Sequence, residues 1–454
     1  MGIDHLDKTQ PNVLRNGPDI VIREGTLLSS AREGTMTGKV DILIGGSRIV
    51  DITPARAYPT EGDAEIIDAR NCIVMPGLIN SHAHSAMTLF RGYADDLPLR
   101  QWLYDRIFPA EAEIVNAESV YWGTMLACLE MIGSGTTGVI ESYFFADSAA
   151  RAFHESGLRA VIAQGVIDYP APGVKDPGRN LSVAKEFIEK WLHTSELITP
   201  GLFCHSPITC SDRTLTRAMG ISKDFALPMQ THLSETLEEV EEIIKRTGKR
   251  PVPYLDELGI IDRDLIAAHA IHLDTREIAT LSERGAGAVH VPESNMKLSS
   301  GVAKVPEMIS MGVNVGIGTD GCASNNNLDL FKEMDTAAKL GKVYTGDPVN
   351  MSAETVLEMA TSGGAKLMGL AEDIGRMEKG KKADIIVIDM NSPHLVPVYN
   401  PVSTLVYSAN GADTKDVIVN GRILMKDRQF KTLDQDKILQ KVREISVKIR
   451  DLMP

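Results

Sequence analysis

Short apolar runs recur along the middle of the chain and predict strands that alternate with helices. Eight runs rich in β-branched residues cover positions 74–82, 137–143, 159–168, 199–206, 228–235, 265–273, 286–295 and 313–321. Stretches long enough for helices separate them, among them 182–192, 235–246 and 275–284. Apolar runs joined by helices are typical of parallel strands with crossover connections. Eight such units predict a TIM-like (β/α)8 barrel, because a doubly wound sheet usually has fewer strands.

The two ends of the chain carry a different pattern, which indicates hairpins. Residues 40–50 predict a hairpin with a Gly-Gly turn, and residues 417–424 predict another with an Asn-Gly turn. Asn-Gly between apolar runs is a strong hairpin signal. Residues 383–388 add a further strand. We expect these pieces to meet in one small composite β-sandwich beside the barrel.

These patterns divide the chain into three parts. Residues 1–73 are expected to form the N-terminal part of the sandwich, 74–370 the barrel, and 371–454 the C-terminal part with a closing helix. Apolar residues at helical spacing between 434 and 452 predict that helix, which would pack on the body through one face. The first 18 or so residues are polar and are not assigned to any element.

Composition and charge exclude several classes of protein. The chain has 454 residues, 43% hydrophobic and 24% charged, which is ordinary for a globular protein with a large core. A net charge of −14 without a dense Lys/Arg stripe argues against nucleic acid or an anionic membrane as a partner. No apolar stretch approaches the roughly 20 residues that span a bilayer, and the first residues lack a signal-peptide core. A homo-oligomer is compatible with these features.

Cysteine usage indicates a reducing compartment. The five cysteines are scattered, odd in number and contain no Cys-x-x-Cys pair: Cys72, Cys128, Cys204, Cys210 and Cys322. This pattern argues against a disulfide framework and against a zinc ribbon. We therefore expect a cytoplasmic protein.

Histidines and an aspartate stand where the predicted barrel strands end. Barrel enzymes place their chemistry at the carboxyl ends of the strands. Five of the 11 histidines, and one aspartate, lie there: His82, His84, His205, His232, His269 and Asp320. A single one of them would more often be an ordinary core histidine or a turn cap. Together, three histidines and one aspartate would suit Zn²⁺, or Fe²⁺ as a second choice, with a position left for a water that ionises near neutral pH.

Four segments give a specific resemblance. They are 76–84 (Pro-Gly-Leu-Ile-Asn-Ser-His-Ala-His), 231–235 (Thr-His-Leu-Ser-Glu), 293–301 (Glu-Ser-Asn-Met-Lys-Leu-Ser-Ser-Gly) and 318–326 (Gly-Thr-Asp-Gly-Cys-Ala-Ser-Asn-Asn). With them the chain resembles the amidohydrolase superfamily, and within it the 5-methylthioadenosine/S-adenosylhomocysteine deaminases. The resemblance implies a distorted (β/α)8 barrel with a composite β-sandwich. It also implies an aminohydrolase that removes ammonia from the adenine ring of a nucleoside.

The resemblance also implies roles for individual residues. The metal ligands would be His82, His84, His232 and Asp320. The fourth predicted strand ends in Cys204-His205-Ser206 and offers no lysine for carbamylation, which favours one metal ion over two. Glu235 would shuttle protons to the base and the departing ammonia. His269, together with Asp320, would orient and deprotonate the water.

Further residues would bind the rest of the substrate. By the same resemblance, His205 would contact the nucleoside, Glu111 would accept hydrogen bonds from the ribose hydroxyls, and Arg179 would reach the 5′ end. Trp102 would form part of the pocket lip. Arg179 could equally be an ordinary surface residue. Trp102 could equally be a residue of the hydrophobic core.

The sequence leaves two other functions open. One is a hydrolase of a different ring, of guanine, pterin or triazine type. Glu235 fits any aminated heterocycle, whereas Glu111 favours one that carries ribose. The other is a catalytically silent metal-binding or scaffold protein, which the presence of Glu235, His269 and all four ligand candidates argues against. The sequence leaves open which 5′ substituent is preferred.

Overall fold

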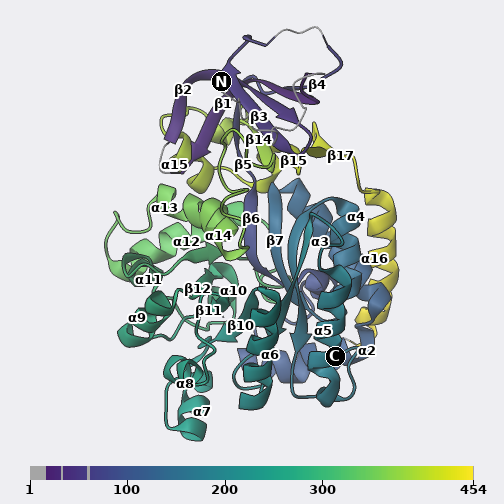
Figure 1. The fold of residues 1–454 in the computed structure, drawn as a ribbon, viewed down its shortest axis with the longest axis vertical. Helices are drawn as coiled ribbons and strands as arrows, with labels where there is room; N and C mark the ends of the chain where they lie inside the picture. Colours follow the sequence, from purple (N-terminus) through teal and green to yellow (C-terminus); the bar gives the residue numbers. More distant parts are fainter. Residues whose placement is uncertain (1–16, 32–33, 59–61, 453–454) are drawn as a thin grey trace, which may run out of the picture.

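Eight parallel strands form the barrel that the apolar runs predict (Figure 1). The computed structural model describes residues 17–31, 34–58 and 62–452. Each barrel strand pairs with its neighbour in chain order: β6 (Leu78–Ala83), β7 (Thr136–Tyr143), β8 (Arg159–Val166), β9 (Ile198–Cys204), β10 (Met229–Leu233), β11 (Leu265–His269), β12 (Gly287–His290) and β13 (Val315–Ile317). The predicted (β/α)8 architecture is therefore confirmed.

The barrel closes through the segment that follows its last strand. The Asp320 N–H donates to the His82 carbonyl at 3.0 Å, and the Thr319 N–H donates to Asn80 Oδ1 at 3.1 Å. A Cβ at Gly318 would lie 2.8 Å from the backbone N and O of His82, so only glycine allows this approach. The closure is thus irregular, and it brings Asp320 next to the first strand.

Helices surround the barrel and connect its strands. The main ones are α3 (Ala117–Gly133), α4 (Ala146–Ser156), α5 (Asn180–Trp191), α6 (Asp212–Phe225), α7 (Leu237–Thr247), α8 (Pro251–Glu257), α9 (Thr275–Arg284), α10 (Pro292–Lys297), α11 (Val305–Ser310), α12 (Leu330–Thr345) and α13 (Ala353–Glu358). The helix predicted over 275–284 is α9, which Asp274 caps at its start and Gly285, with φ 75°, ends. The other two predicted helices correspond to α5 and α7.

Apolar side chains fill the amino-terminal end of the barrel. Leu367, at the end of the short helix α14 (Gly364–Leu367), and the next residue, Met368, share a core cluster with inward residues of several strands, such as Ile79 and Ile140. The opposite, carboxyl-terminal end is where the polar strand ends gather.

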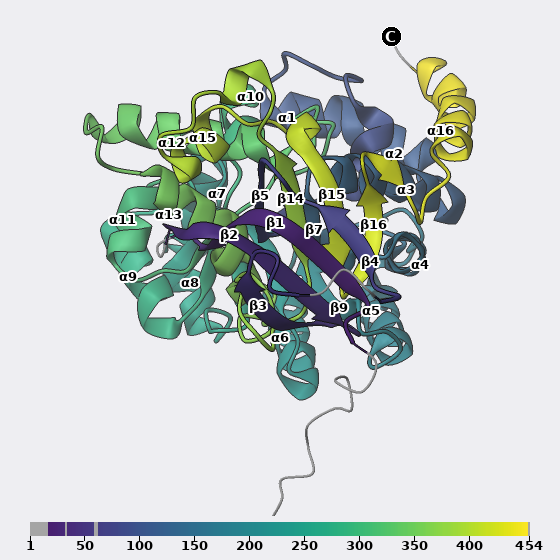
Figure 2. The same ribbon diagram turned by 90° about the horizontal axis from the view of Figure 1, so that it is seen from above.

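Strands from both ends of the chain form a second sheet (Figure 2). Its strands are β1 (Ile20–Ser30), β2 (Gly34–Gly45), β3 (Arg48–Pro54), β4 (Glu65–Asp68), β5 (Cys72–Pro76), β14 (Ile385–Asp389), β15 (Thr414–Val419), β16 (Arg422–Lys426) and β17 (Gln429–Phe430). Antiparallel pairing of β5 with β14 joins the two ends. The predicted composite β-unit is confirmed; its nine strands are hydrogen-bonded as one continuous sheet with a core of its own.

One glycine carries the chain from this sheet into the barrel. The apolar run 74–82 is continuous in sequence, but β5 ends at Pro76 and β6 begins at Leu78. A Cβ at Gly77 would lie 2.0 Å from Thr137 Oγ1, so the crossing requires glycine. The buried pair of Arg159 and Asp384, 2.6 Å apart, ties the barrel to the sheet a second time.

The C-terminal helix α16 (Gln435–Arg450) packs along α3, on the outside of the barrel (Figures 1 and 2). It is the helix that the pattern over 434–452 predicts, and Asp434 caps its start. The first 16 residues of the N-terminal segment lie outside the described part. No helix among the described residues is long and apolar enough to cross a membrane.

Candidate active site

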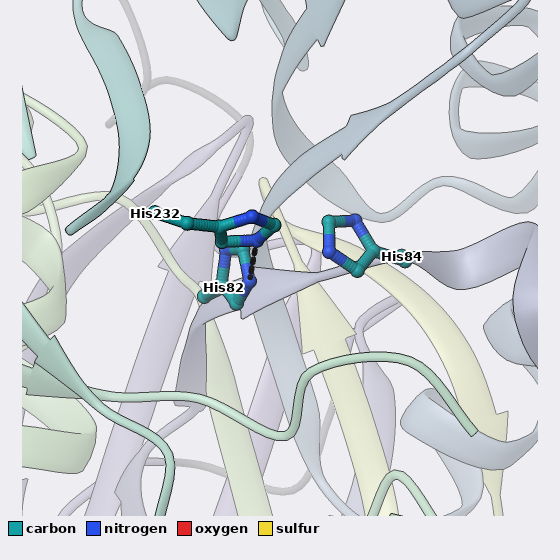
Figure 3. Close-up of side chains that lie close together, drawn as sticks. All are labelled: His82, His84 and His232. Carbon is teal, nitrogen blue, oxygen red and sulfur yellow. Dashed lines mark hydrogen bonds between the residues drawn. The ribbon is translucent and has the colours of Figure 1, made fainter. Parts of the chain in front are cut away.

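Four side chains from three different strands converge at the open end of the barrel. His82 lies on β6, His84 follows it directly, His232 lies on β10 and Asp320 follows β13. Asp320 Oδ1 is 3.6 Å from His82 Nε2 and 3.4 Å from His84 Nε2, and the Nε2 atoms of His82 and His232 are 3.3 Å apart. Figure 3 shows the three imidazoles facing one another. The predicted ligand set is therefore brought together.

The protonation states of this cluster fit a metal ion. Burial, together with the neighbouring His82, lowers the pKa of His84 to about 3, and burial lowers the pKa of His232 well below its usual value. Burial alone would raise the pKa of Asp320, but its contacts with His82 and His84 hold it well below the usual range. Neutral imidazoles and an ionised carboxylate are the forms that bind metals. Such a donor set suits zinc or another divalent ion.

Two hydroxyl groups orient the aspartate. Ser294 Oγ and Ser324 Oγ donate to Asp320 Oδ2 at 2.7 and 3.0 Å. Oδ1 thereby stays free to face the imidazoles. A ligand whose second oxygen is held in this way is the usual arrangement at protein metal sites.

Glu235 and His269 lie beside the cluster. His269 Nε2 is 3.8 Å from Glu235 Oε2, and Ser300 Oγ donates to Glu235 Oε1 at 3.3 Å. Burial raises the pKa of Glu235. Burial opposes a charge on His269, but the carboxylates of Glu235 and Asp320 outweigh it and raise the pKa of His269. Two titratable groups whose pKa values are both raised therefore meet at one place, as is typical of acid–base sites.

Three residues of the site have a left-handed backbone. The φ angles are 67° at His269, 62° at Asp320 and 51° at Ser234. Each costs conformational energy in a residue other than glycine and persists only where the surroundings enforce it. Here the Glu239 carboxylate accepts the N–H groups of Ser234 and Glu235 at 3.0 and 2.8 Å. Glu239 therefore holds the turn that carries Glu235.

The cluster faces a cavity that opens into a wider groove. The inner cavity has a volume of about 100 Å³, and the outer groove about 840 Å³. Pockets that bury a drug-sized ligand measure roughly 300–1,000 Å³, so a ligand in the inner cavity must extend into the groove. Residues that line both include Leu99, Leu103, His205, His232, Glu235 and Leu298.

The structure places most of the predicted substrate residues in the inner cavity. Trp102 belongs to a short π-helical segment, η3 (Trp102–Ile107), and Glu111 to α2 (Phe108–Ile114); both are buried and line the cavity with His205. Tyr143 donates a hydrogen bond to Glu111, whose pKa burial nonetheless raises to about 7. Trp102, Glu111 and His205 therefore share one cavity with Glu235.

Arg179 is the exception. It ends the turn η4 (Pro177–Arg179), its side chain is 63% exposed, and its guanidinium lies 3.9 Å from Glu186. It lines neither the inner cavity nor the outer groove. The structure does not bring Arg179 to the other candidate residues.

Sequence reasoning missed several residues at the site. Phe203 packs against His232 and His84 with ring centroids 5.1 and 5.7 Å apart. His290 ends β12, and burial lowers its pKa to about 3. Gln230 hydrogen-bonds His82. Gln230 stands two positions before His232, and that strand spacing is the signal that could have found it.

Comparison with known proteins decides the family. The model of the amidohydrolase family matches residues 73–424. The chain belongs to the amidohydrolase family. Within this family it is 46% identical over 433 residues to a 5-methylthioadenosine/S-adenosylhomocysteine deaminase of Syntrophobacter fumaroxidans, with 95% of this chain and 98% of the relative covered.

Two further relatives extend the comparison. A 5′-deoxyadenosine deaminase of Methanosarcina mazei is 42% identical, with 94% of this chain and 97% of the relative covered. The crystal structure of an adenosine deaminase from Xanthomonas campestris with bound zinc is 34% identical, with a TM-score of 0.93 and 96% and 100% of the two chains covered. The predicted superfamily and subgroup are thereby confirmed.

Proposed function

We propose that this amidohydrolase is a metal-dependent hydrolytic deaminase of adenosine-type nucleosides, among them 5-methylthioadenosine and S-adenosylhomocysteine. It would release ammonia and leave the inosine analogue. The observation that carries the proposal is that ligand, proton-transfer and ribose-binding candidates line one cavity, with His82 directly behind them. The 46% identity to a deaminase of these nucleosides, over nearly the full length of both chains, supports the same assignment.

One divalent ion, zinc in the first place and Fe²⁺ in the second, would be held by His82, His84, His232 and Asp320. When bound, it would lower the pKa of a water molecule so that hydroxide is available near neutral pH. Neither Cys204 nor His205 at the end of β9 could supply the bridging carbamate of a two-metal centre, which supports a single ion. The bound zinc of the Xanthomonas relative supports the choice of metal.

Three side chains would carry the proton transfers. Asp320 and His269 orient the attacking water and accept its proton. Glu235 would give its proton to the ring nitrogen beside the reacting carbon, then take the second proton from the attacking oxygen and pass it to the amino group, which leaves as ammonia. The proton held by Asp320 and His269 would return to Glu235, which lies 3.8 Å from His269, and so restore the starting state. A carboxyl group whose pKa is raised by burial keeps a proton for this purpose closer to neutral pH than an exposed one.

Glu111 would bind the ribose hydroxyls, with His205 beside the nucleoside and the buried Trp102 on the wall of the inner cavity. We expect Glu111→Ala to weaken the binding of ribonucleosides by roughly 1.5–3 kcal/mol, because a charged hydrogen bond is lost. The measurement is kcat/KM for adenosine and for 2′,3′-dideoxyadenosine. Glu113→Ala, on the exposed face of the same helix, is the matched control. An equal loss for both nucleosides would show that Glu111 does not contact the hydroxyls.

Arg179 remains our candidate for the 5′ end, with a small expected effect. Only S-adenosylhomocysteine has a carboxylate in its tail. Arg179→Ala should therefore lower kcat/KM for S-adenosylhomocysteine more than kcat/KM for 5-methylthioadenosine. The exposure of Arg179 limits the difference to about 0.2–1 kcal/mol. Arg100, which lines the outer groove, provides the comparison variant Arg100→Ala. Equal kcat/KM losses for both nucleosides in Arg179→Ala would remove this residue from tail recognition.

The alternative is a deaminase or hydrolase of a guanine, pterin or triazine ring. Glu235 would serve such rings equally well, but the buried Glu111 favours a substrate with vicinal hydroxyls. A panel of these compounds and of adenosine, 5′-deoxyadenosine, 5-methylthioadenosine and S-adenosylhomocysteine, assayed for ammonia with zinc present, separates the two. Ammonia from guanine or a triazine, and from none of the nucleosides, would contradict our proposal.

Three further proposals concern the cellular compartment, the division of the chain into domains and the assembly state. The five cysteines all lie in the described part and are free thiols, which supports a reducing cytoplasm as the place of action. We propose that the chain divides into residues 1–73, 74–370 and 371–454, because the two sheets separate in this way. The first boundary falls within β5. A homo-oligomer is proposed as compatible with this fold.

A further inference from the structure

Gln230 is a buried amide beside the ligand cluster to which the proposed mechanism gives no task. It lies on β10, two residues before His232, and is 1% exposed. Its Nε2 donates to the Ser81 carbonyl at 3.0 Å, and its Oε1 is 2.7 Å from His82 Nδ1. We propose that Gln230, with Ser142, is a positioning residue that fixes the ring nitrogen each of two histidine ligands presents to the metal.

The orientation of the amide follows from its partners. A backbone carbonyl such as that of Ser81 can only accept a hydrogen bond, so the amide group turned toward it is the NH₂. Oε1 therefore faces His82, and an amide oxygen can only accept. His82 Nδ1 must then carry the hydrogen. In a neutral ring this leaves the lone pair on Nε2, the atom that lies 3.6 Å from Asp320 Oδ1.

Ser142 extends the same control to the second histidine. Its hydroxyl donates to Gln230 Oε1 at 2.7 Å, while its backbone carbonyl accepts from His84 Nδ1. His84 thus also presents Nε2, which lies 3.4 Å from Asp320 Oδ1. Strands β6, β7 and β10 are tied together by this network, so the donor atoms are set before any ion arrives.

The choice of an amide has a chemical reason. A carboxylate could accept from His82 and Ser142, but it could not donate to Ser81, and it would place an uncompensated charge in a buried site. The amide satisfies all three neighbours without adding charge. Groups that hold the second nitrogen of a ligating histidine typically contribute 10–100-fold to metal affinity.

The inference rests on the metal site proposed above, but not on the choice of substrate. Its test is therefore the zinc dissociation constant of the full chain, measured by competition with a chromophoric chelator. Gln230→Met keeps the bulk and removes the polar atoms, so we expect zinc to bind about 10–100-fold more weakly. The rise in Tm on adding zinc should shrink in the same variant.

Gln164→Met is the matched control. Gln164 is likewise buried, on β8, but it bonds only the backbone N–H of Ala146 and the carbonyl of Gly165. A merely structural role would lower the Tm of the metal-free protein in both variants and leave zinc affinity unchanged. Wild-type zinc affinity in Gln230→Met would therefore overturn the inference.

Ser142→Ala gives a second, milder test, because it removes the hydroxyl and keeps the carbonyl that holds His84. We expect weaker zinc binding than in wild type and tighter binding than in Gln230→Met. If Gln230→Met does not fold, unchanged zinc affinity in Ser142→Ala overturns the inference by itself. If the unaltered protein binds no zinc, the proposed metal site fails and the inference fails with it.

Discussion

Glu235→Gln should lose turnover by about 10⁴-fold or more while it keeps its metal. A positioned acid–base group contributes about 10²–10⁴-fold, and Glu235 would serve several proton transfers in one turnover. Glutamine keeps the shape and the contact with Ser300 but has no proton to exchange. The measurement is kcat for 5-methylthioadenosine, together with the zinc content of the same preparation.

The control for this change is Glu241→Gln, which alters an exposed glutamate of α7, the helix that begins just after Glu235. It should retain wild-type kcat and zinc content. Near-normal turnover in Glu235→Gln would remove Glu235 from the mechanism. Loss of zinc together with turnover would instead mean that the residue supports the metal site and not the proton transfer.

The double change His82→Ala and His84→Ala should abolish both zinc binding and activity. It removes two of the four proposed ligands and leaves only His232 and Asp320 of that set, too few for a tetrahedral site. Metal analysis of the unaltered protein, purified without chelator, should give one ion per chain. The double variant should give none.

A surface histidine provides the control here. His154→Ala, on the exposed side of α4, should leave one ion per chain and full activity. Two ions per chain in the unaltered protein would contradict the single-metal proposal. Zinc retained by the double variant would show that the ion is held by other residues.

The parts of the site that could be predicted are those that topology fixes. Once eight parallel strands are assigned, the barrel forces every strand end onto one face, so His82, His232 and Asp320 must converge whatever the details of packing. The Asn-Gly turn of the C-terminal hairpin is likewise a local signal that needs no tertiary information. Both predictions rest on backbone geometry that the sequence pattern specifies directly.

Other features depend on contacts between distant segments, and no local pattern contains them. Gly77 looks like any glycine in an apolar run, but its neighbour Thr137 makes it the crossing point between two sheets. The left-handed backbone of His269 and the hydrogen bonds of Gln230 arise only after neighbouring strands have paired. Arg179 lies on a loop, where the sequence gives no direction for the side chain.

In the proposed reaction, water replaces the amino group of an adenine ring that remains attached to its sugar. The most direct test is mass spectrometry of 5-methylthioadenosine after reaction with the zinc-loaded enzyme in heavy-oxygen water. Our proposal predicts one heavy oxygen per product molecule, located on the purine ring, with one ammonia released and the methylthioribose intact. Unchanged 5-methylthioadenosine, or free adenine as the product, would contradict it.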